Sequence, residues 1–494
     1  MDFKMKILNF KLLITTIIFT LITISLYAQE PTKAAIKANG QLVYQPIKTV
    51  DNFDAMLKDG TFYGRLRNNN FYFAFERQDG AHDTHEVSGF GASVVYKSAS
   101  LNGFDFTAGV YGSYSFFNAN SDNISFFKPG KDTLNRHSYI NSGDRSMYVL
   151  GQANLNYRLS KTDLTLGRQL VETFYTKSND TKMVPNTFDG FVLTTKELPQ
   201  TTLKAAYLTK QKLRDHIVEH SVFMVGDSNS SSSVAPQWTQ NDDSAMLKGL
   251  TYSKLLAAGK PTDAPLILLD VANNSVKNLK INFSSYIVPE LLSQAMGELN
   301  YKIQLDGFSI TPGFRYIQQF DQGAGAIAGP SLSVLLTGST AYKDPNSLNS
   351  KMIAARVVTK IDDYKINLAY TNILDEADLV TPWRGFPTAG YTRSMGMYNW
   401  RANTKSYRVE LVKGANKTGV YKNVFIQTSV LYIDGDDKKS AYSDSIFYYL
   451  GCVQNLPSMP EFQYRLRLGW RDFIDSSASA SDYLDSRLEF NYLF

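Results

Sequence analysis

The last thirteen residues, 482–494, alternate between apolar and polar side chains. One parity carries Leu484, Leu488, Phe490, Tyr492 and the final Phe494, and the charged and amide residues lie between them. This period of two is typical of a β-strand, because successive side chains of a strand point to opposite faces. An edge strand of a soluble sandwich would alternate in the same way, but a turn or tail normally follows it. The segment predicts an amphipathic strand that ends on an aromatic residue.

The composition constrains what kind of protein can end in such a strand. Of 494 residues, 30 are Tyr and 30 are Phe, yet no apolar run of about 20 residues follows the N-terminal region. Helical membrane proteins need such runs, whereas a transmembrane β-barrel needs only one apolar face on each strand. No change in composition marks a domain boundary. The terminal aromatic strand also resembles the insertion signal that closes bacterial outer-membrane barrels, so we expect a barrel of this kind in the outer membrane of a Gram-negative bacterium.

The first residues, 1–28, have the pattern of a secretory signal peptide. Lys4, Lys6 and Lys11 provide its positive region, 12–26 its apolar region, and cleavage is expected before Gln29. An uncleaved single-span anchor is the alternative, disfavoured because the apolar run is short for a bilayer crossing. The polar segment 29–60 is predicted to be a short periplasmic lead, too short for the plug domain of energised importers.

Residues 61–494 are predicted to form the barrel domain, an all-β antiparallel fold of about 18 strands. Connections after even-numbered strands are short and those after odd-numbered strands long, which predicts periplasmic turns and outer loops. Closure leaves no strand edge exposed to lipid, and a barrel of this size encloses a lumen that loops must narrow. The predicted strands are 61–76, 86–98, 104–117, 144–160, 162–171, 187–197, 201–214, 264–272, 278–288, 292–304, 307–320, 349–361, 364–374, 403–413, 421–434, 444–454, 461–473 and 481–494.

The segment 165–190 carries a specific motif, Asn179-Asp180-Thr181-Lys182 followed by Pro185. It resembles the third-loop region of the OprD-like porins, where an Asn-Asp-Thr-Arg-x-x-Pro run follows the fifth strand and the loop folds inward as a constriction. The opening strand, 64–68, is similar as well. Lys182 stands where the family has Arg, and the outer loop near Pro289 is very short. The resemblance implies a channel without enzymatic activity or cofactor.

Arginines recur on the parity that faces the lumen. On the seventeenth predicted strand Arg465, Arg467 and Arg471 alternate with apolar residues, and closure would bring strand 18 and strand 1 beside them. Guanidinium groups stay charged and bind carboxylates bidentately, so a row of them could pass an anionic group between sites. OprD-like porins are similar in having such a basic ladder, which conducts small carboxylates. The predicted pore-lining residues are Arg65, Arg67, Arg158, Arg408, Arg465, Arg467, Arg471 and Arg487.

This pattern predicts passive, selective diffusion of small water-soluble solutes that carry a carboxylate, such as amino acids and small organic acids. The alternative is that the arginines pair with Asp485, Glu489 and Glu410 and leave a pore with little charge preference. Arg168 has the outward parity, so we expect it at a loop base or after a bulge. The partners expected are outer-membrane lipid and small anionic or zwitterionic solutes, and the chain could act as a monomer or a homotrimer.

Two outer loops are candidates for narrowing the pore. Loop 3, about 171–186, is the predicted constriction, with Asn179, Asp180 and Lys182 as polar contacts and Tyr175 as a wall. Alternatively, it packs on the barrel wall without touching solute. Loop 7, 375–402, has acidic residues that could oppose the basic wall and orient zwitterions, although an extended, solvated loop fits its sequence equally well.

Two other functional classes stay open on sequence grounds. A barrel hydrolase needs a nucleophile near a histidine, but all five histidines fall in predicted outer loops and are expected to be solvated. Two pairs have metal-like spacing without a third ligand, so no metal site is predicted. An adhesin or receptor barrel would use the Ser-rich segment 227–233 as its contact surface. Cys452 is expected to pack in a strand, and no nucleic-acid signature is present. The histidines are His82, His85, His137, His216 and His220.

Overall fold

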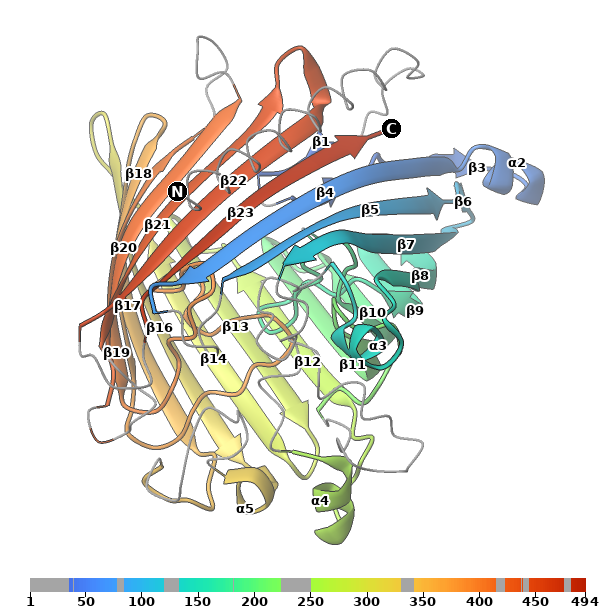
Figure 1. Ribbon diagram of the computed structural model, residues 1–494. Coiled ribbons are helices and arrows are strands. Elements are labelled where there is room, and N and C mark those ends of the chain that lie inside the picture. The colour runs from blue at the N-terminus through green and yellow to red at the C-terminus, as the bar shows by residue number, and fades with distance from the viewer. Residues whose placement is uncertain are drawn as a thin grey trace.

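Eighteen long antiparallel strands close into one barrel, as the sequence predicts (Figure 1). The ring runs from β4 through β23 and back to β4. The computed structural model describes residues 35–38, 40–77, 84–119, 133–180, 182–223, 250–329, 342–414, 423–436, 438, 444–474 and 481–494. The predicted signal peptide, Thr181, His82 and the Ser-rich segment 227–233 lie outside these residues.

The eighteen strands start and end within a few residues of the predicted bounds. They are β4 (Thr61–Phe75), β5 (His85–Lys97), β7 (Phe104–Ala119), β8 (Ser146–Leu159), β9 (Thr162–Gln169), β10 (Thr187–Thr195), β11 (Thr201–Lys212), β12 (Leu266–Asn273), β13 (Leu279–Val288), β14 (Leu292–Tyr301), β16 (Ser309–Asp321), β17 (Ser350–Ile361), β18 (Tyr364–Ile373), β19 (Thr404–Lys413), β20 (Val424–Asp434), β21 (Ser445–Leu456), β22 (Met459–Phe473) and β23 (Tyr483–Leu493).

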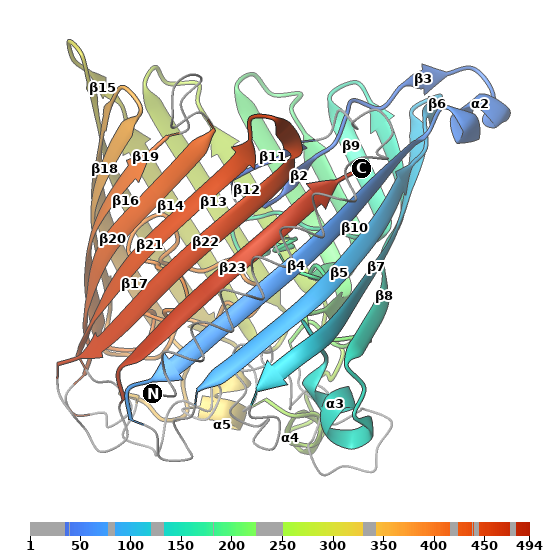
Figure 2. The ribbon, with the colours of Figure 1, turned by 45° about the horizontal axis from the view of Figure 1, so that its top comes forward.

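Several short elements were not predicted. They are strands β1 (Ala35–Ile36), β2 (Leu42–Val43), β3 (Thr49–Val50), β6 (Ser100–Leu101) and β15 (Ile303–Gln304), and helices α2 (Phe53–Lys58), α3 (Arg136–Ser142), α4 (Tyr252–Ala257) and α5 (Ala324–Ala328). The last three helices lie in outer loops, at the end of the barrel opposite the C-terminus (Figure 2). No helix in the described part of the chain is long and apolar enough to cross a membrane.

The last strand, β23, closes the ring between β22 and β4. The backbone N–H of Phe494 donates to the Gly64 carbonyl at 3.0 Å, and the Gly64 N–H donates to the Phe494 carbonyl at 2.9 Å. A side chain at Gly64 would collide with the Phe494 ring, so the aromatic terminus needs a glycine opposite it. In this register Arg467 pairs with Arg487, which places both arginines side by side on one wall.

Side chains alternate between lipid and lumen as a barrel requires. On β19, Tyr407, Val409 and Leu411 are exposed on the outside, while Arg408 and Glu410 are buried inside. Cys452 has the outward parity on β21 and is half-buried there, consistent with a packing role.

The lumen is not evenly open, because a large apolar cluster fills part of it. This cluster joins the inner faces of β10 through β18 to residues of the outer loops, among them Phe223, Leu255, Trp383 and Trp400. The loops therefore form a folded core inside the barrel, and the remaining space lies toward β22, β23 and β4.

Candidate functional site

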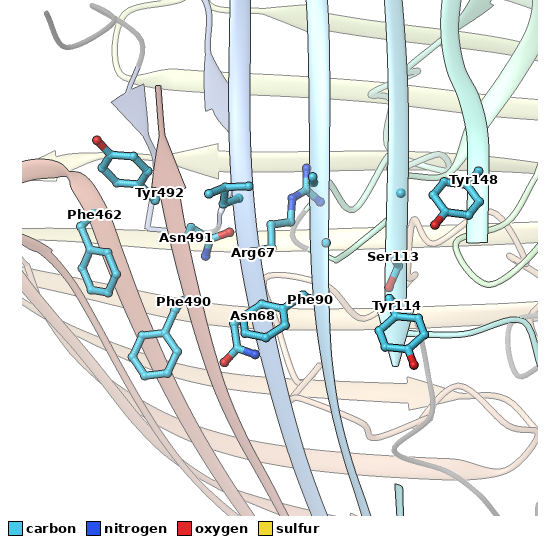
Figure 3. A pocket seen from close by; sticks show the side chains of 14 residues that line it. Arg67, Asn68, Phe90, Ser113, Tyr114, Tyr148, Phe462, Phe490, Asn491 and Tyr492 are labelled. Carbon is cyan, nitrogen blue, oxygen red and sulfur yellow. The ribbon is translucent and has the colours of Figure 1, made fainter. Parts of the chain in front are cut away.

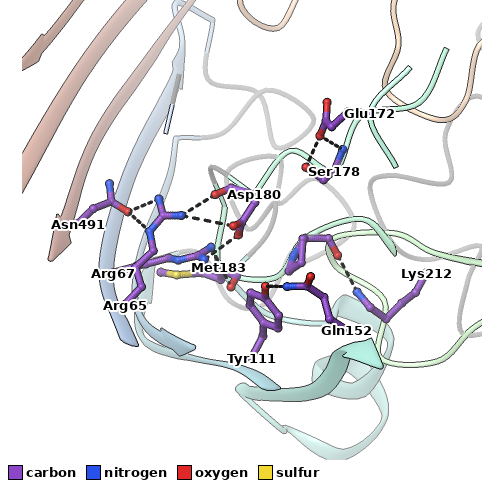
Figure 4. A network of polar contacts seen from close by, with 11 residues as sticks. Arg65, Arg67, Tyr111, Gln152, Glu172, Ser178, Asp180, Met183, Lys212 and Asn491 are labelled. Atoms are coloured by element: carbon purple, nitrogen blue, oxygen red, sulfur yellow. Dashed lines mark hydrogen bonds and ion pairs between the residues drawn. The ribbon is translucent and has the colours of Figure 1, made fainter. Parts of the chain in front are cut away.

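Loop 3 is held against the inner wall by two arginines of β4 (Figure 4). Arg65 donates through Nη1 to the Asp180 carbonyl at 2.8 Å and through Nη2 to Oδ1 of Asn491 at 2.7 Å. Arg67 donates through Nη2 to Oδ1 of Asp180 at 2.7 Å and through Nη1 to the Met183 carbonyl at 3.2 Å. The predicted inward fold of loop 3 is therefore present, and charge-assisted hydrogen bonds fix it.

This arrangement changes the role expected of three residues. The sequence placed Arg65 and Arg67 on the open pore wall and Asp180 in contact with solute. The side chains of Arg65 and Arg67 are buried beneath loop 3, and both form ion pairs with the buried Asp180 of that loop. The inward parity was predicted correctly, but the fold of the loop covers the arginines, so they position the constriction instead of lining it.

Loop 7 lies inside the barrel and pairs with loop 3. The Gly385 N–H donates to the Tyr175 carbonyl and the Lys177 N–H to the Trp383 carbonyl, each at 2.9 Å. A bridge between Thr176 and Arg384 extends this pairing. A side chain at Gly385 would meet the loop 3 backbone, so the two loops approach as closely as glycine permits. Of the two alternatives for loop 7, the extended, solvated loop is not the one found.

Arginines of the opposite wall bind loop 7 by donating hydrogen bonds to the backbone carbonyl groups of the loop. Arg315 of β16 donates through Nη1 to Pro387 and Ala389 at 2.7 and 2.8 Å, and Arg356 of β17 donates to Gly390 at 2.8 Å. Glu298 pairs with Arg315, so the anchor carries its own counter-charge. The two loops therefore bridge the lumen from one wall to the other.

The acidic residues of loop 7 do not face the basic wall. The Asp378 carboxylate accepts the Ala402 N–H at 2.8 Å, and Glu376 pairs with Lys351 at 2.8 Å. The predicted wall residue Tyr175 is fully buried, with its ring 4.8 Å from that of Tyr286. These groups therefore stabilise the loops, and neither Glu376 nor Asp378 opposes the basic wall in the way expected from the sequence.

A cavity of about 270 Å³ remains between the two loops and the wall of β22 and β23. Its lining contains eight cationic side chains and one carboxylate, with two aromatic rings on the loop 7 side. The residues that line it are Gln41, Glu172, Lys177, Asn179, Lys182, Arg214, Arg384, Phe386, Arg393, Met395, Gly396, Tyr398, Arg465, Arg467 and Arg487.

Carboxylates of β23 pair with several of these cations. Glu489 accepts from Arg467 at 2.7 Å and lies within 3.7 Å of Arg465 and 3.5 Å of Lys182. Arg487 donates to Asp485 at 2.5 and 2.8 Å. The pairing that would neutralise the wall is therefore present at these residues, while the lining itself contains eight cationic side chains and one carboxylate.

Arg393 of loop 7 adds a cation that is stacked on aromatic rings. Its guanidinium carbon lies 4.5 Å from the centre of Phe386 and 5.7 Å from that of Trp400. Burial lowers the pKa of Arg393 to about 10, so the group stays charged at pH 7. Two other lining residues, Asn179 and Arg384, have positive φ of 47° and 71°, a conformation that costs a non-glycine residue energy and is often found at functional sites.

The remaining predicted arginines lie away from the cavity. Arg158 pairs with Asp163 at 2.5 Å beside a periplasmic turn and is about half exposed. Arg408 pairs with Glu410 and donates to the Tyr391 carbonyl of loop 7 at 3.1 Å. Arg471 donates to Ser445 Oγ at 3.1 Å. Arg168, at the end of β9, pairs with Asp189 and with Glu219 of an outer loop, so the expected loop-base position is found.

Besides Glu172, five amide or cationic residues of the cavity were not predicted from the sequence. They come from loops and from the lead, where no strand period tells which way a side chain points. The density of aromatic residues around Arg384 and Arg393 was the available signal, because a solvated loop rarely carries two tryptophans. The missed residues are Gln41, Lys177, Arg214, Arg384 and Arg393.

The histidine pair of the loop after β11 is buried, contrary to the prediction that it is solvated. Nδ1 of His216 lies 2.8 Å from Nε2 of His220, and Nδ1 of His220 lies 2.8 Å from the Ser221 carbonyl. His220 therefore donates to Ser221 and accepts from His216 when both rings are neutral. His85 is also buried, at the start of β5. Among the described residues no group of three potential ligands could hold a metal ion.

We expect protonation of this histidine pair at acid pH to destabilise the loop after β11. Burial lowers the pKa of His220 from 6.5 to about 4 and lowers that of His216 well below its usual value. The unfolded segment then binds more protons between those pH values, so stability is complete above pH 6.5 and falls by about 3 kcal/mol as the pH drops to 4. Amide exchange of residues 213–223, corrected for its intrinsic pH dependence, should accelerate between pH 7 and 4.5. The same acceleration in a variant with both His216→Gln and His220→Gln would contradict this assignment.

A second hollow, of about 390 Å³, lies on the lipid-facing side of the barrel wall (Figure 3). Outward aromatic residues of several strands surround it, among them Phe90, Tyr148, Phe462 and Phe490. Its apolar lining suits the hydrocarbon of a membrane and offers no path for a water-soluble solute.

The closed ring, the inward loops and the charged lumen define an outer membrane porin. Residues 54–255 match the family model described as "outer membrane porin, OprD family". This part of the chain resembles that family, and together with the fold it indicates a channel of the Gram-negative outer membrane rather than an enzyme. No curated protein sequence matches the chain.

Solved structures of channels have the same fold at low sequence identity. OpdK from Pseudomonas aeruginosa, solved with vanillate, is 13% identical with a TM-score of 0.64, covering 89% of this chain and 99% of that chain. OccK8 (OprE) from the same species is 15% identical with a TM-score of 0.66, covering 89% and 99%. OccAB1 from Acinetobacter baumannii is 15% identical with a TM-score of 0.67, covering 89% and 97%.

Proposed function

We propose that this porin conducts small solutes that carry a carboxylate, and that the cavity between loops 3 and 7 selects them. The observation that supports this most directly is the cavity lining, with eight cationic side chains and one carboxylate. Arg465, Arg467 and Arg487 supply planar guanidinium groups, which bind carboxylates through paired hydrogen bonds. A carboxylate in this space exchanges water for several donors, whereas a cation is repelled.

The arginines of β22 form a path along the lumen. Arg467 and Arg465 occupy consecutive inward positions, about 7 Å apart along the strand, and Arg471 lies on the outer side of them, about 14 Å from Arg467 because Gly469 stands between. Arg487 lies beside Arg467 in the neighbouring strand. A carboxylate can therefore contact the next guanidinium before it leaves the last one, which lowers the barrier to passage.

Aromatic carboxylates fit the proposal as well as aliphatic ones. Phe386 and Tyr398 line the cavity beside Arg393, and a planar ring can stack on such groups while its carboxylate meets the arginines. OpdK, which shares the fold, was solved with vanillate, an aromatic carboxylate. The oligomeric state stays a prediction, monomer or homotrimer.

Liposome swelling with a matched solute pair tests the proposal. Gluconate and glucose have nearly the same size but differ in the carboxylate, and vanillate adds the aromatic case. We expect gluconate to enter about threefold faster than glucose, because one charge about 7 Å away in water contributes about 0.6 kcal/mol. The preference should shrink when the salt concentration rises from about 0.1 to 1 M, since the Debye length falls from about 10 to 3 Å. Equal rates at low salt would refute carboxylate selection.

A further inference from the structure

The segment that precedes the barrel lies inside it. Gln463 has the inward parity on β22, and its Nε2 donates to the carbonyls of Ile36 and Lys37 at 3.4 and 3.1 Å. The hairpin of β1 and β2 is thereby bound to the same strand that carries Arg465 and Arg467. The sequence alone predicts a short periplasmic lead over 29–60, and the family match begins only at residue 54.

The segment then crosses to β4 and reaches the base of loop 3. The Tyr44 ring lies 4.8 Å from that of Tyr63 in an edge-to-face contact, and the Gln45 N–H donates to the Tyr63 hydroxyl at 3.1 Å. Tyr44 also packs on the cluster in which Met183 of loop 3 contacts the inner wall. The chain leaves the lumen where the Ser100 N–H donates to the Lys48 carbonyl at 2.7 Å.

Between these two attachments, Gln41 lines the cationic cavity. The segment is thus bound to β22 on one side and to β4 on the other, across β23. Gln41 stands between them, against the arginines of β22 and β23. A residue in this position borders the space through which ions pass.

We propose that residues 40–45 form an inner strap that narrows the porin, and that Gln41 is a specificity-determining residue of the channel. The amide of Gln41 donates hydrogen bonds to a carboxylate and carries no charge. A solute that leaves the guanidinium groups therefore meets a weaker donor, which favours release. The strap limits the bore for every ion, so the narrowing does not depend on the preference for carboxylates, whereas the role of the Gln41 amide as a donor rests on the proposed function.

Thiol labelling of Gln41→Cys in a Cys452→Ser background tests the strap. Two methanethiosulfonate reagents of similar size are applied, one with a sulfonate and one with an ammonium group, and labelling is measured by mass. We expect both to lower the single-channel conductance in KCl by roughly half, because they occupy the lumen. The sulfonate adduct should also lower the ratio of anion to cation permeability, and the ammonium adduct should not.

Asp59→Cys in the same background is the matched control. Asp59 is exposed at the end of α2, in the part of the lead that follows the strap, so its labelling should leave the current unchanged. Complete labelling of position 41 without any change in conductance would place the strap outside the conduction path. A Gln41→Cys thiol that resists both reagents from both sides of the bilayer would show that position 41 does not face water, and would equally overturn the proposal. Carboxylate preference is measured separately, by liposome swelling.

Discussion

Replacing Arg465 and Arg467 together by alanine is expected to lower the ratio of anion to cation permeability about tenfold. Each guanidinium changes the energy of an ion about 7 Å away by about 0.6 kcal/mol in water, with opposite sign for anions and cations. Salt reduces the sum of these effects, but both side chains lie on the cavity itself. The reversal potential of planar bilayers under a KCl gradient measures the ratio.

Two further variants separate charge from position. Arg158→Ala removes the same kind of residue beside a periplasmic turn, where it is about half exposed, and should leave the reversal potential unchanged. Lysines at both 465 and 467 should keep the reversal potential but reduce the preference for gluconate over chloride, since lysine lacks the planar fork of donors. An unchanged reversal potential in the double alanine variant would reject the ladder.

Replacing Asp180 by asparagine is expected to release loop 3 and raise the single-channel conductance roughly twofold. The substitution keeps the shape of the side chain but leaves Arg65 and Arg67 buried without their carboxylate. Removing one partner of a buried ion pair lowers stability by about 3 to 5 kcal/mol. We expect loop 3 to lose its ordered conformation after a loss of this size. Single-channel recordings should show larger and noisier currents.

Asp189→Asn is the control for this prediction. Asp189 also pairs with an arginine, Arg168, at 2.8 Å, but both side chains are about one quarter exposed, so water can replace the lost contact. The variant should conduct like the parent protein. If Asp180→Asn protein inserts normally and keeps the parent conductance, the clamp does not hold the constriction.

The barrel could be predicted because its signal is local. Each strand has one face toward lipid and one toward the lumen, so a period of two appears within about ten residues, as in β19. The number of strands, their inward parity and the sidedness of the loops follow from that local pattern. The inner hairpin of β1 and β2 escaped prediction because two residues per strand show no period.

The site could be predicted only where it lies on strands. Arg465, Arg467 and Arg487 were placed correctly on one wall, because closure fixes β23 between β22 and β4. The loops follow no such rule. Whether Arg67 faces water depends on Asp180, which is 113 residues away along the chain, and the place of Arg384 depends on backbone pairing between two loops.

The barrel seam has a consequence for the order in which the channel is assembled. The cationic wall combines β22 and β23, the last two strands of the ring in chain order, with β4, the first strand, whose Arg67 binds loop 3. Until the ends of the chain meet, Asp180 has its arginines but Glu489 and Asn491 are not yet beside them. An unfinished barrel consequently lacks the complete cationic wall, which is assembled in the same step that closes the ring.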